Sequence, residues 1–363
     1  MSKDKTVYII GAGFSKSANI PLQSELLDEI FKVKENDLLD EYDEYKDIFN
    51  QYRNAFKKFL SDTMFIEEKD FAKISLEDIY TPIDRCVVDN LAFRNISPKD
   101  LIDIRQKING LIIMLLKRKT TKCDHVEKFT KYLINKKEEQ KKDSFAIIST
   151  NWDILIDNSF KRNSKGVIDY CCHTTPYSGQ NMPALVALTK NLFTIKLLKL
   201  HGSMNWLQCK RCQRLFVTFF EKIAIDEYIN KPICKFCKEN FKDENANGGA
   251  LLSSQLIMPT FLKDLNNVQL KLIWQNAGIE LSEASSIVFM GYSFPTADFE
   301  LRQLLARNVR HSAKIEVVLC PSDKPTNDKD TNSPENRFKS FFGKREVNFY
   351  YEGVEEYIKT NYT

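Results

Sequence analysis

The sequence contains little glycine and proline, no long hydrophobic run and no large excess of either charge. Gly and Pro supply only 12 and 11 of the 363 residues, which argues against long flexible linkers. The longest apolar run, Leu111–Leu116, ends at Lys117 and is far shorter than the roughly 20 residues that a membrane span needs. The 53 basic and 49 acidic residues give a net charge of +4, too balanced to indicate nucleic acid as the main ligand.

Size and composition indicate a globular protein with one large domain and an insert, or with two domains. Hydrophobic residues make up 43% and charged residues 28% of the chain. The apolar stretch Val7–Ile10 is short and runs directly into Gly11, as a buried strand does and a signal peptide does not. We therefore expect a cytoplasmic protein without membrane contact, in which the nine cysteines do not form a disulfide framework.

Short, nearly continuous apolar runs alternate with helical patterns and predict an α/β fold. The predicted strands are Thr6–Ile10, Phe145–Ser149, Ile195–Leu200, Ile287–Met290, Ile315–Leu319 and Val347–Tyr350. Apolar residues at helical spacing in Leu22–Val33 and Ala297–Asn308 predict helices between strands. This alternation is typical of a doubly wound, Rossmann-like parallel sheet with helices on both faces.

Two stretches do not follow this alternation and are expected to form smaller units. Residues 35–142 are rich in charged residues and mostly helical in period, which predicts a helical insert beside the sheet. Residues 209–247 contain two Cys-x-x-Cys pairs and predict a separate zinc-ribbon module. The Rossmann-like domain is then expected to comprise residues 1–34, 143–208 and 248–363.

Small, polar and ionisable residues follow most of the predicted strands. Because ligands of an open parallel sheet bind beyond the carboxyl ends of its strands, these segments predict one shared site. The segments are Gly11–Ser15, Thr150–Asp153, His201–Ser203, Gly291–Pro295 and Cys320–Asp323.

The segment Gly11-Ala12-Gly13-Phe14-Ser15 is a candidate phosphate-binding turn. Its glycines let the backbone approach a phosphate, Ser15 adds a hydroxyl donor, and a following helix would offer free N–H groups. Lys16 stands where the dinucleotide fingerprint has its third glycine, so a plain strand-to-helix turn is the alternative.

His201, Asn151 and Asp153 are the candidate catalytic residues at this rim. His201 is one of only four histidines and has the chemistry of a general base at neutral pH. Asn151 has the chemistry to orient a water or a ribose hydroxyl, and Asp153 to accept from a carboxamide N–H₂. The alternatives are a structural histidine, and helix capping by the Asn and the Asp.

The most specific pattern in the sequence is Cys209-x₂-Cys212, 21 intervening residues, and Cys234-x₂-Cys237. Each pair can place two thiolates on one ion, and four thiolates complete a tetrahedral Zn²⁺ shell. A closed shell leaves no open coordination position, so we expect a structural zinc ion rather than a catalytic one.

These motifs, in this order, resemble those of sirtuins, and more closely the sirtuin-like NAD-hydrolysing domains of bacterial antiviral defence systems. Gly11–Ser15 resembles the Gly-Ala-Gly-x-Ser start, and Ser149–Asp153 resembles Thr-Gln-Asn-Ile-Asp. His201-Gly202 matches the catalytic His-Gly, Gly291-Tyr292-Ser293 resembles Gly-Thr-Ser, and the Cys pairs fall where a sirtuin has its zinc ribbon. The resemblance spans residues 5 to about 320.

The resemblance implies an enzyme that binds NAD⁺ as substrate and cleaves the bond between nicotinamide and ribose. It implies that Ser15 and Ser293 contact phosphates, that Asn151 and His201 face the nicotinamide ribose, and that Asp153 holds the carboxamide. Deacylating sirtuins continue Ile-Pro with Asp-Phe-Arg, whereas Ile20-Pro21 continues here with Leu22-Gln23-Ser24-Glu25, so the aromatic lid and the arginine are both missing. The asparagine that sirtuins have after the next strand is also missing near Cys320. Both departures favour hydrolysis to nicotinamide and ADP-ribose over deacylation.

The leading hypothesis is therefore an NAD⁺ glycohydrolase that depletes NAD⁺ in an antiphage defence system. The resembling systems imply control by homo-oligomerisation or by an activating partner such as a motor ATPase, with the helical insert as the candidate assembly surface. The alternatives are an NAD-dependent protein-lysine deacylase and a non-catalytic sensor of NAD⁺ or ADP-ribose whose zinc ribbon binds nucleic acid. Mixed charge around the Cys pairs makes direct nucleic-acid binding the less favoured reading.

Overall fold

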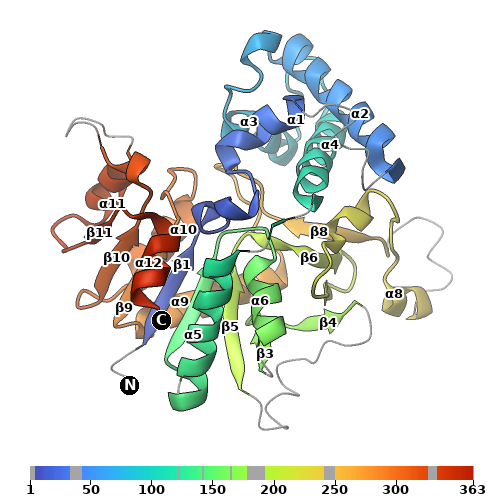
Figure 1. Cartoon of the computed structure of the whole chain (residues 1–363). Helices are drawn as coiled ribbons and strands as arrows, with labels where there is room; N and C mark the ends of the chain where they lie inside the picture. The colour runs from blue at the N-terminus through green and yellow to red at the C-terminus, as the bar shows by residue number, and fades with distance from the viewer. Residues whose placement is uncertain are drawn as a thin grey trace.

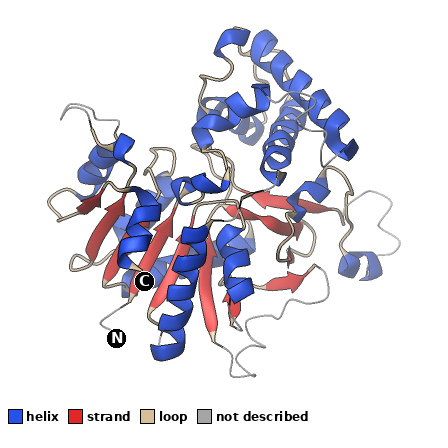
Figure 2. Ribbon diagram, viewed as in Figure 1, coloured by secondary structure: helices blue, strands red, loops and turns tan. Residues whose placement is uncertain are grey.

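The chain folds into a parallel sheet with helices on both faces, a second small sheet and a helical lobe (Figures 1 and 2). These features come from a computed structural model. Its described residues are 5–32, 43–118, 120–121, 123–140, 143–163, 166–177, 193–240, 250–325 and 333–362. None of the described helices combines the length and the apolar character needed to cross a bilayer.

The main sheet has seven strands, in the order β11-β10-β9-β1-β2-β5-β3, and every neighbouring pair is parallel. Its strands are β1 (Thr6–Ile10), β2 (Phe145–Ser149), β3 (Val167–Asp169), β5 (Thr194–Lys199), β9 (Ser286–Met290), β10 (Lys314–Val318) and β11 (Asn348–Tyr350). The predicted fold class is confirmed, and each predicted strand is present within a residue at either end. From β1 the chain passes to β2 and then to the edge strand β3, comes back to β5 between them, and later crosses to β9 on the other side of β1. This reversal places a topological switch point between β1 and β9.

Helices cover both faces of this sheet (Figure 1). On one face α5 (Asp124–Gln140) packs against α6 (Leu155–Asn163) and α12 (Gly353–Asn361). On the other face α9 (Val268–Glu283) packs against α10 (Phe299–Asn308). The apolar runs of the strands are thereby enclosed from both sides, as continuous rather than alternating patterns require.

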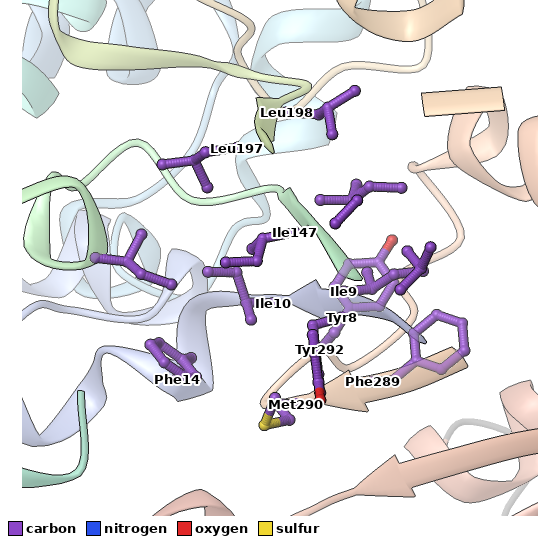
Figure 3. Close-up of a cluster of buried hydrophobic side chains, with 14 of the residues drawn as sticks. Tyr8, Ile9, Ile10, Phe14, Ile147, Leu197, Leu198, Phe289, Met290 and Tyr292 are labelled. Carbon is purple, nitrogen blue, oxygen red and sulfur yellow. The ribbon is translucent and has the colours of Figure 1, made fainter. Parts of the chain in front are cut away.

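A cluster of buried side chains fills the space between the sheet and these helices (Figure 3). Tyr8, Ile9 and Ile10 of β1 lie at its centre, with Ile147 and Phe289 from the flanking strands. At the end of the chain α11 (Pro334–Phe342) stacks Phe338 against Phe294, with ring centroids 4.6 Å apart. The apolar strands therefore form one continuous core that fixes where each strand ends.

The helical lobe has a hydrophobic core of its own. It is built by α1 (Leu26–Lys32), α2 (Asp43–Lys58) with a π-turn at Phe59–Thr63, α3 (Leu76–Asp89) and α4 (Pro98–Lys117). Helix α5 belongs to the predicted insert of residues 35–142, yet its buried residues join the core of the main sheet. The lobe with its own core thus extends from α1 to α4, because α5 presents its apolar face to the sheet.

The second sheet has the order β4-β7-β6-β8 and was not predicted from the sequence. Its strands are β4 (Thr174–Pro176), β6 (Gly202–Cys209), β7 (Leu215–Val217) and β8 (Leu252–Leu256), and α8 (Lys235–Asn240) lies beside them. All eight residues of β6 are buried, and polar residues alternate with apolar ones only over Ser203–Trp206, because Leu207 follows Trp206 directly and breaks the pattern. Strand β6 begins directly after His201, so the two sheets meet at the candidate catalytic histidine.

Candidate active site

A cavity of about 500 Å³ lies beyond the carboxyl ends of the main-sheet strands. It is lined by residues on both sides of the switch point between β1 and β9 and by residues of the helical lobe, among them Leu26, Glu77 and Leu116. Each of the five predicted rim segments contributes to its wall. The predicted convergence of these segments on one site is therefore a feature of the fold, and the volume is that of a small-molecule site.

Three glycines bring the loops after β1 and β9 into direct backbone contact. A Cβ added at Gly11 would lie 2.7 Å from the carbonyl oxygen of Gly291. Gly291 has φ +60°, and a Cβ there would lie 2.3 Å from the amide nitrogen of Phe14. The amide of Gly13 donates to the carbonyl of Gly291 over 2.8 Å. These glycines thus allow two loops to touch, in addition to any approach to a phosphate.

The turn after β1 differs from the prediction of a helix directly after the glycines. It continues as two 3₁₀ turns, Ala12–Phe14 and Lys16–Ala18, and α1 begins only at Leu26. The predicted helix N-terminus is therefore not present at this turn. These 3₁₀ turns lie in the loop that packs tightly against Gly291.

The five residues of this turn have different surroundings. Ala12 and Gly13 line the cavity. Phe14 points into the hydrophobic core, where its ring packs edge-on against Phe129 (Figure 3). Ser15 is 1% exposed, and its Oγ accepts from Asn151 Nδ2 over 3.2 Å. Ser15 thus holds Asn151 in place, and only a ligand that displaced this arrangement would reach its hydroxyl.

Asn151 is fixed by the loop after β1. Its Nδ2 donates to the carbonyl of Gly11 over 2.9 Å and to Ser15 Oγ. Its backbone amide donates to Ser149 Oγ over 3.1 Å. Since both side-chain donors are engaged, the carbonyl oxygen of the Asn151 side chain is the group available to a ligand in the cavity.

His201 lines the cavity and is only 8% exposed. Burial lowers the pKa of His201 below its ordinary value, and nearby Lys263 lowers it too, whereas Asp298 and a hydrogen bond with the Thr150 backbone act in the opposite direction. The Thr150 amide is already used by Ile10, so its carbonyl is the group that holds the ring. His201 Nε2 is buried and has no hydrogen-bond partner among the described residues. The ring therefore presents a neutral imidazole with a free acceptor, as a general base requires.

Asp298 and Lys263 lie next to His201 and were not identified from the sequence. Asp298 Oδ1 lies 3.6 Å from His201 Nε2 and 3.2 Å from Lys263 Nζ, and Tyr292 OH donates to Asp298 Oδ2 over 2.7 Å. Burial would raise the pKa of Asp298, but His201, Lys263 and Tyr292 bring it below the usual range, so the carboxylate is ionised. No spacing in the sequence connects these residues, because they come from separate loops.

Asp153 and Trp152 complete the wall on the β2 side. Asp153 Oδ1 accepts from the Leu155 amide over 3.0 Å, so it caps the start of α6, which was the alternative to a ligand-binding role. Trp152 Nε1 is buried without a hydrogen-bond partner among the described residues. Because buried polar groups are rarely left unpaired, this indole is a further candidate contact for a ligand.

The remaining predicted residues also line the cavity. Gly291 and Ser293 line it after β9, and Cys320 does so after β10. Gln23 and Ser24 line it where the sirtuin resemblance would place a phenylalanine and an arginine. The departures from that pattern are thus located in the wall of the cavity itself.

The four cysteines predicted to bind zinc form one cluster at the end of β6. Their Sγ atoms all lie within 4.8 Å of one another, with 3.7 Å between Cys209 and Cys237 and between Cys212 and Cys234. A tetrahedral Zn²⁺ with Zn–S bonds of about 2.3 Å places neighbouring sulfurs about 3.8 Å apart. The cluster therefore fits a closed tetrahedral Cys₄ site, held by a small core that includes Leu207.

Of the comparisons with known proteins, only the one with solved structures finds matches, and sirtuins are among them. No protein-family model matches the chain, and no curated protein matches it. A structure from a study of sirtuin substrate affinity is 16% identical, with a TM-score of 0.39 over 98% of this chain and 91% of that chain. A structure from work on the mechanism and regulation of Sir2 enzymes is 15% identical, with a TM-score of 0.41 over 98% and 93%. A Sir2 homologue in complex with ADP-ribose is 13% identical, with a TM-score of 0.42 over 98% and 90%. At this level of similarity, the activity of this chain has to be argued from its own residues.

Proposed function

We propose that this protein is an NAD⁺ glycohydrolase that converts NAD⁺ and water into nicotinamide and ADP-ribose. The observation that carries the proposal is the free Nε2 of His201, a neutral buried base that faces a cavity at the switch point of a parallel sheet. Nucleotides bind at such switch points in doubly wound folds. The motifs occur in the same order as in sirtuins, and this resemblance indicates that the nucleotide is NAD⁺.

The proposed reaction breaks the bond between the nicotinamide nitrogen and C1′ of the ribose. Nicotinamide leaves as a neutral molecule because it takes the electron pair of that bond, so the reaction needs little acid assistance. The side-chain oxygen of Asn151, fixed by its two donor bonds, is proposed to orient the ribose or the attacking water. His201 is proposed to accept the proton of the attacking group.

The cavity wall supports hydrolysis over transfer to an acyl-lysine. A deacylase has to exclude water and to hold a peptide beside the ribose. Here Gln23 and Ser24 occupy the wall where deacylating sirtuins have a phenylalanine and an arginine, so neither the aromatic lid nor the cation is supplied from these positions. We therefore place deacylation second, and formation of O-acyl-ADP-ribose from an acylated peptide would reverse this order.

We further propose that the activity depletes NAD⁺ during antiphage defence and is switched on by self-assembly or by a partner such as a motor ATPase. This step extends the sirtuin resemblance of the sequence. It predicts that expression of the protein lowers cellular NAD⁺ only after phage infection. It also predicts that the purified protein gains specific activity with concentration or with its partner. A monomer that is fully active at all concentrations would contradict it.

The direct test is to incubate the purified protein with NAD⁺ and to follow nicotinamide and ADP-ribose by chromatography. The expected result is release of both products in equal amounts by the wild type and by neither His201→Ala nor Asn151→Ala. Binding of NAD⁺ by calorimetry distinguishes an enzyme that awaits activation from a protein without the site. Absence of both binding and release contradicts the proposal.

A further inference from the structure

We propose that Asp298 and His201 together bind the attacking water, and that this pair selects water over any other acceptor of the ribosyl group. The inference rests on the proposed function and adds a second residue to its chemistry. It starts from an arrangement in the cavity wall that the sequence motifs do not contain: a carboxylate oxygen 3.6 Å from a free imidazole nitrogen.

The distance between Asp298 Oδ1 and His201 Nε2 suits one oxygen atom that bridges the two. At 3.6 Å the two atoms are too far apart for a hydrogen bond with each other. They are close enough for one oxygen atom to lie about 2.8 Å from both, at the apex of a triangle. Both residues line the cavity, so such an oxygen would lie within reach of a bound ligand.

The chemistry of the pair decides which oxygen fits. Neutral His201 offers a lone pair at Nε2, and ionised Asp298 offers a lone pair at Oδ1, so both are acceptors. A water molecule has two hydrogens and can donate one to each. A ribose hydroxyl, an alcohol or a serine hydroxyl has one hydrogen and would leave one acceptor unpaired, which is costly in a buried site.

Lys263 and Tyr292 hold the Asp298 carboxylate in place. Lys263 is 2% exposed and lies 3.2 Å from Oδ1, while Tyr292 OH donates to Oδ2 over 2.7 Å. Lys263 Nζ also lies 3.0 Å from Glu300 Oε2, which balances its charge and acts on His201 only as the weakest of the charges near the ring. These contacts keep Asp298 charged and its orientation fixed at a position that lines the cavity.

In the proposed step every atom and charge is accounted for. The bond between C1′ and the nicotinamide nitrogen breaks, and nicotinamide keeps the electron pair. The water oxygen forms the new bond to C1′, and one of its protons moves to His201 Nε2. The other proton stays on the new hydroxyl of ADP-ribose, where it is hydrogen-bonded to Asp298 Oδ1 during the attack. The proton on His201 then returns to solvent, and Asp298 stabilises the imidazolium until it does.

The test is product partitioning in water–methanol mixtures with NAD⁺ as substrate. Methanol has a methyl group where water has its second hydrogen, so the wild type should form ADP-ribose and very little methyl ADP-ribose. Asp298→Asn replaces an acceptor by a group that can donate. We expect it to slow hydrolysis about tenfold and to raise the ratio of methyl ADP-ribose to ADP-ribose several-fold. The matched control is Glu300→Gln, which removes the other carboxylate on Lys263 and should leave the ratio unchanged.

The outcomes separate this inference from the proposed function. A wild type that neither binds NAD⁺ nor releases nicotinamide contradicts the proposed function and this inference with it. An active wild type whose product ratio is the same in Asp298→Asn contradicts the inference alone, even if the variant is slower. If thermal unfolding shows that Asp298→Asn does not fold, Tyr292→Phe takes its place. Loss of that hydroxyl frees the carboxylate to rotate, and the ratio must then rise in the same direction or the inference is wrong.

Discussion

Gly291 packs directly against Gly13, so that a Cβ added to Gly291 would lie 2.4 Å from the carbonyl carbon of Gly13. This contact joins the loops after β1 and β9 across the switch point of the sheet. The cavity therefore depends on a backbone-to-backbone contact that only glycine permits. The candidate phosphate-binding turn and the Gly-Tyr-Ser segment, read as two motifs in the sequence, are one packed unit in the fold.

The first prediction concerns this contact. Gly291→Ala introduces a clash with backbone atoms and a strained positive φ, so it should lower the free energy of unfolding by about 3 kcal/mol or more and abolish NAD⁺ cleavage. Gly343→Ala is the matched control, because Gly343 has φ +61° and an added Cβ meets nothing within 4 Å. It should cost about 1 to 3 kcal/mol, from backbone strain alone, and leave NAD⁺ cleavage in place. Equal losses in urea denaturation would show that the loop contact contributes nothing.

The second prediction concerns the cysteine cluster. Elemental analysis should find about one zinc per chain, and Cys209→Ser or a strong chelator should lower the melting temperature, because metal binding contributes directly to folding free energy. Cys320→Ser is a suitable control, since Cys320 is exposed and lies outside the cluster. A melting temperature that chelation leaves unchanged would argue against a structural metal.

The third prediction is the loss of catalysis on removing the proposed base. His201→Ala should reduce kcat by about 10² to 10⁴-fold, because a general base contributes that much. The melting temperature should stay within a few degrees of the wild type, since the ring leaves a cavity-facing position rather than a core one. Unfolding of His201→Ala would instead assign the histidine a structural role.

The fourth prediction is the pH dependence that follows from the surroundings of His201. The base is active when neutral, and burial lowers the pKa of His201, so kcat/KM should stay flat down to about pH 6.5 and fall only below it. The charged groups that act on the ring are Asp298, Lys263 and Glu300. Because Asp298 raises the pKa and Lys263 lowers it, Asp298→Asn should move the inflection to lower pH and Lys263→Met to higher pH. Opposite movements would contradict the assignment of His201 as the base.

The fifth prediction concerns a charge cluster at the amino-terminal end of the sheet, away from the cavity. Lys5 is 2% exposed, and its Nζ lies 2.9 Å from Asp143, 2.5 Å from Glu280 and 2.7 Å from Glu283. Lys5→Met leaves buried Glu280 with one cation fewer and should lower the free energy of unfolding by about 3 kcal/mol, with KM for NAD⁺ unchanged. A change in KM without a loss of stability would be inconsistent with this purely structural role.

The same cluster makes a contribution to the free energy of unfolding that decreases as the pH falls. Burial would raise the pKa of Asp143, but Lys196 and Lys5 lower it to about 2. A carboxylate with a lowered pKa stabilises the fold at pH values above its ordinary value and loses this contribution as the pH falls toward 2. The stability difference between the wild type and Lys5→Met should therefore shrink in that range, and urea denaturation at several pH values measures it.

The main sheet could be predicted because its strands are buried on both faces. Runs such as Thr6–Ile10 and Phe145–Ser149 are continuous in apolar character and bounded by polar or small residues, so local pattern and final structure agree. The second sheet could not be predicted. Its β7 is only three residues long, and β6 combines apolar residues with buried Ser203 and Asn205, which are satisfied by a hydrogen bond to each other.

The candidate site could be located from the sequence, but its chemistry was only partly visible. The rim segments carry recognisable residue types, because each one directly follows a strand. Asp298 and Lys263 lie several residues beyond β9 and β8, in loops whose course depends on packing. Nothing near them in the sequence distinguishes them from solvated surface charges, so the closest charged neighbours of His201 were missed.

The sequence by itself determined the strands of the main sheet and the small and polar residues that follow their carboxyl ends. It also determined the four thiols at metal-binding spacing. These properties are local, because apolar periodicity, glycine and paired cysteines act over a few neighbouring residues. Only the tertiary structure decided that Gly291 touches Gly13, that α5 joins the sheet, and that Asp298 lies 3.6 Å from His201. These are contacts between segments far apart in the chain, and packing of the whole core sets their distances.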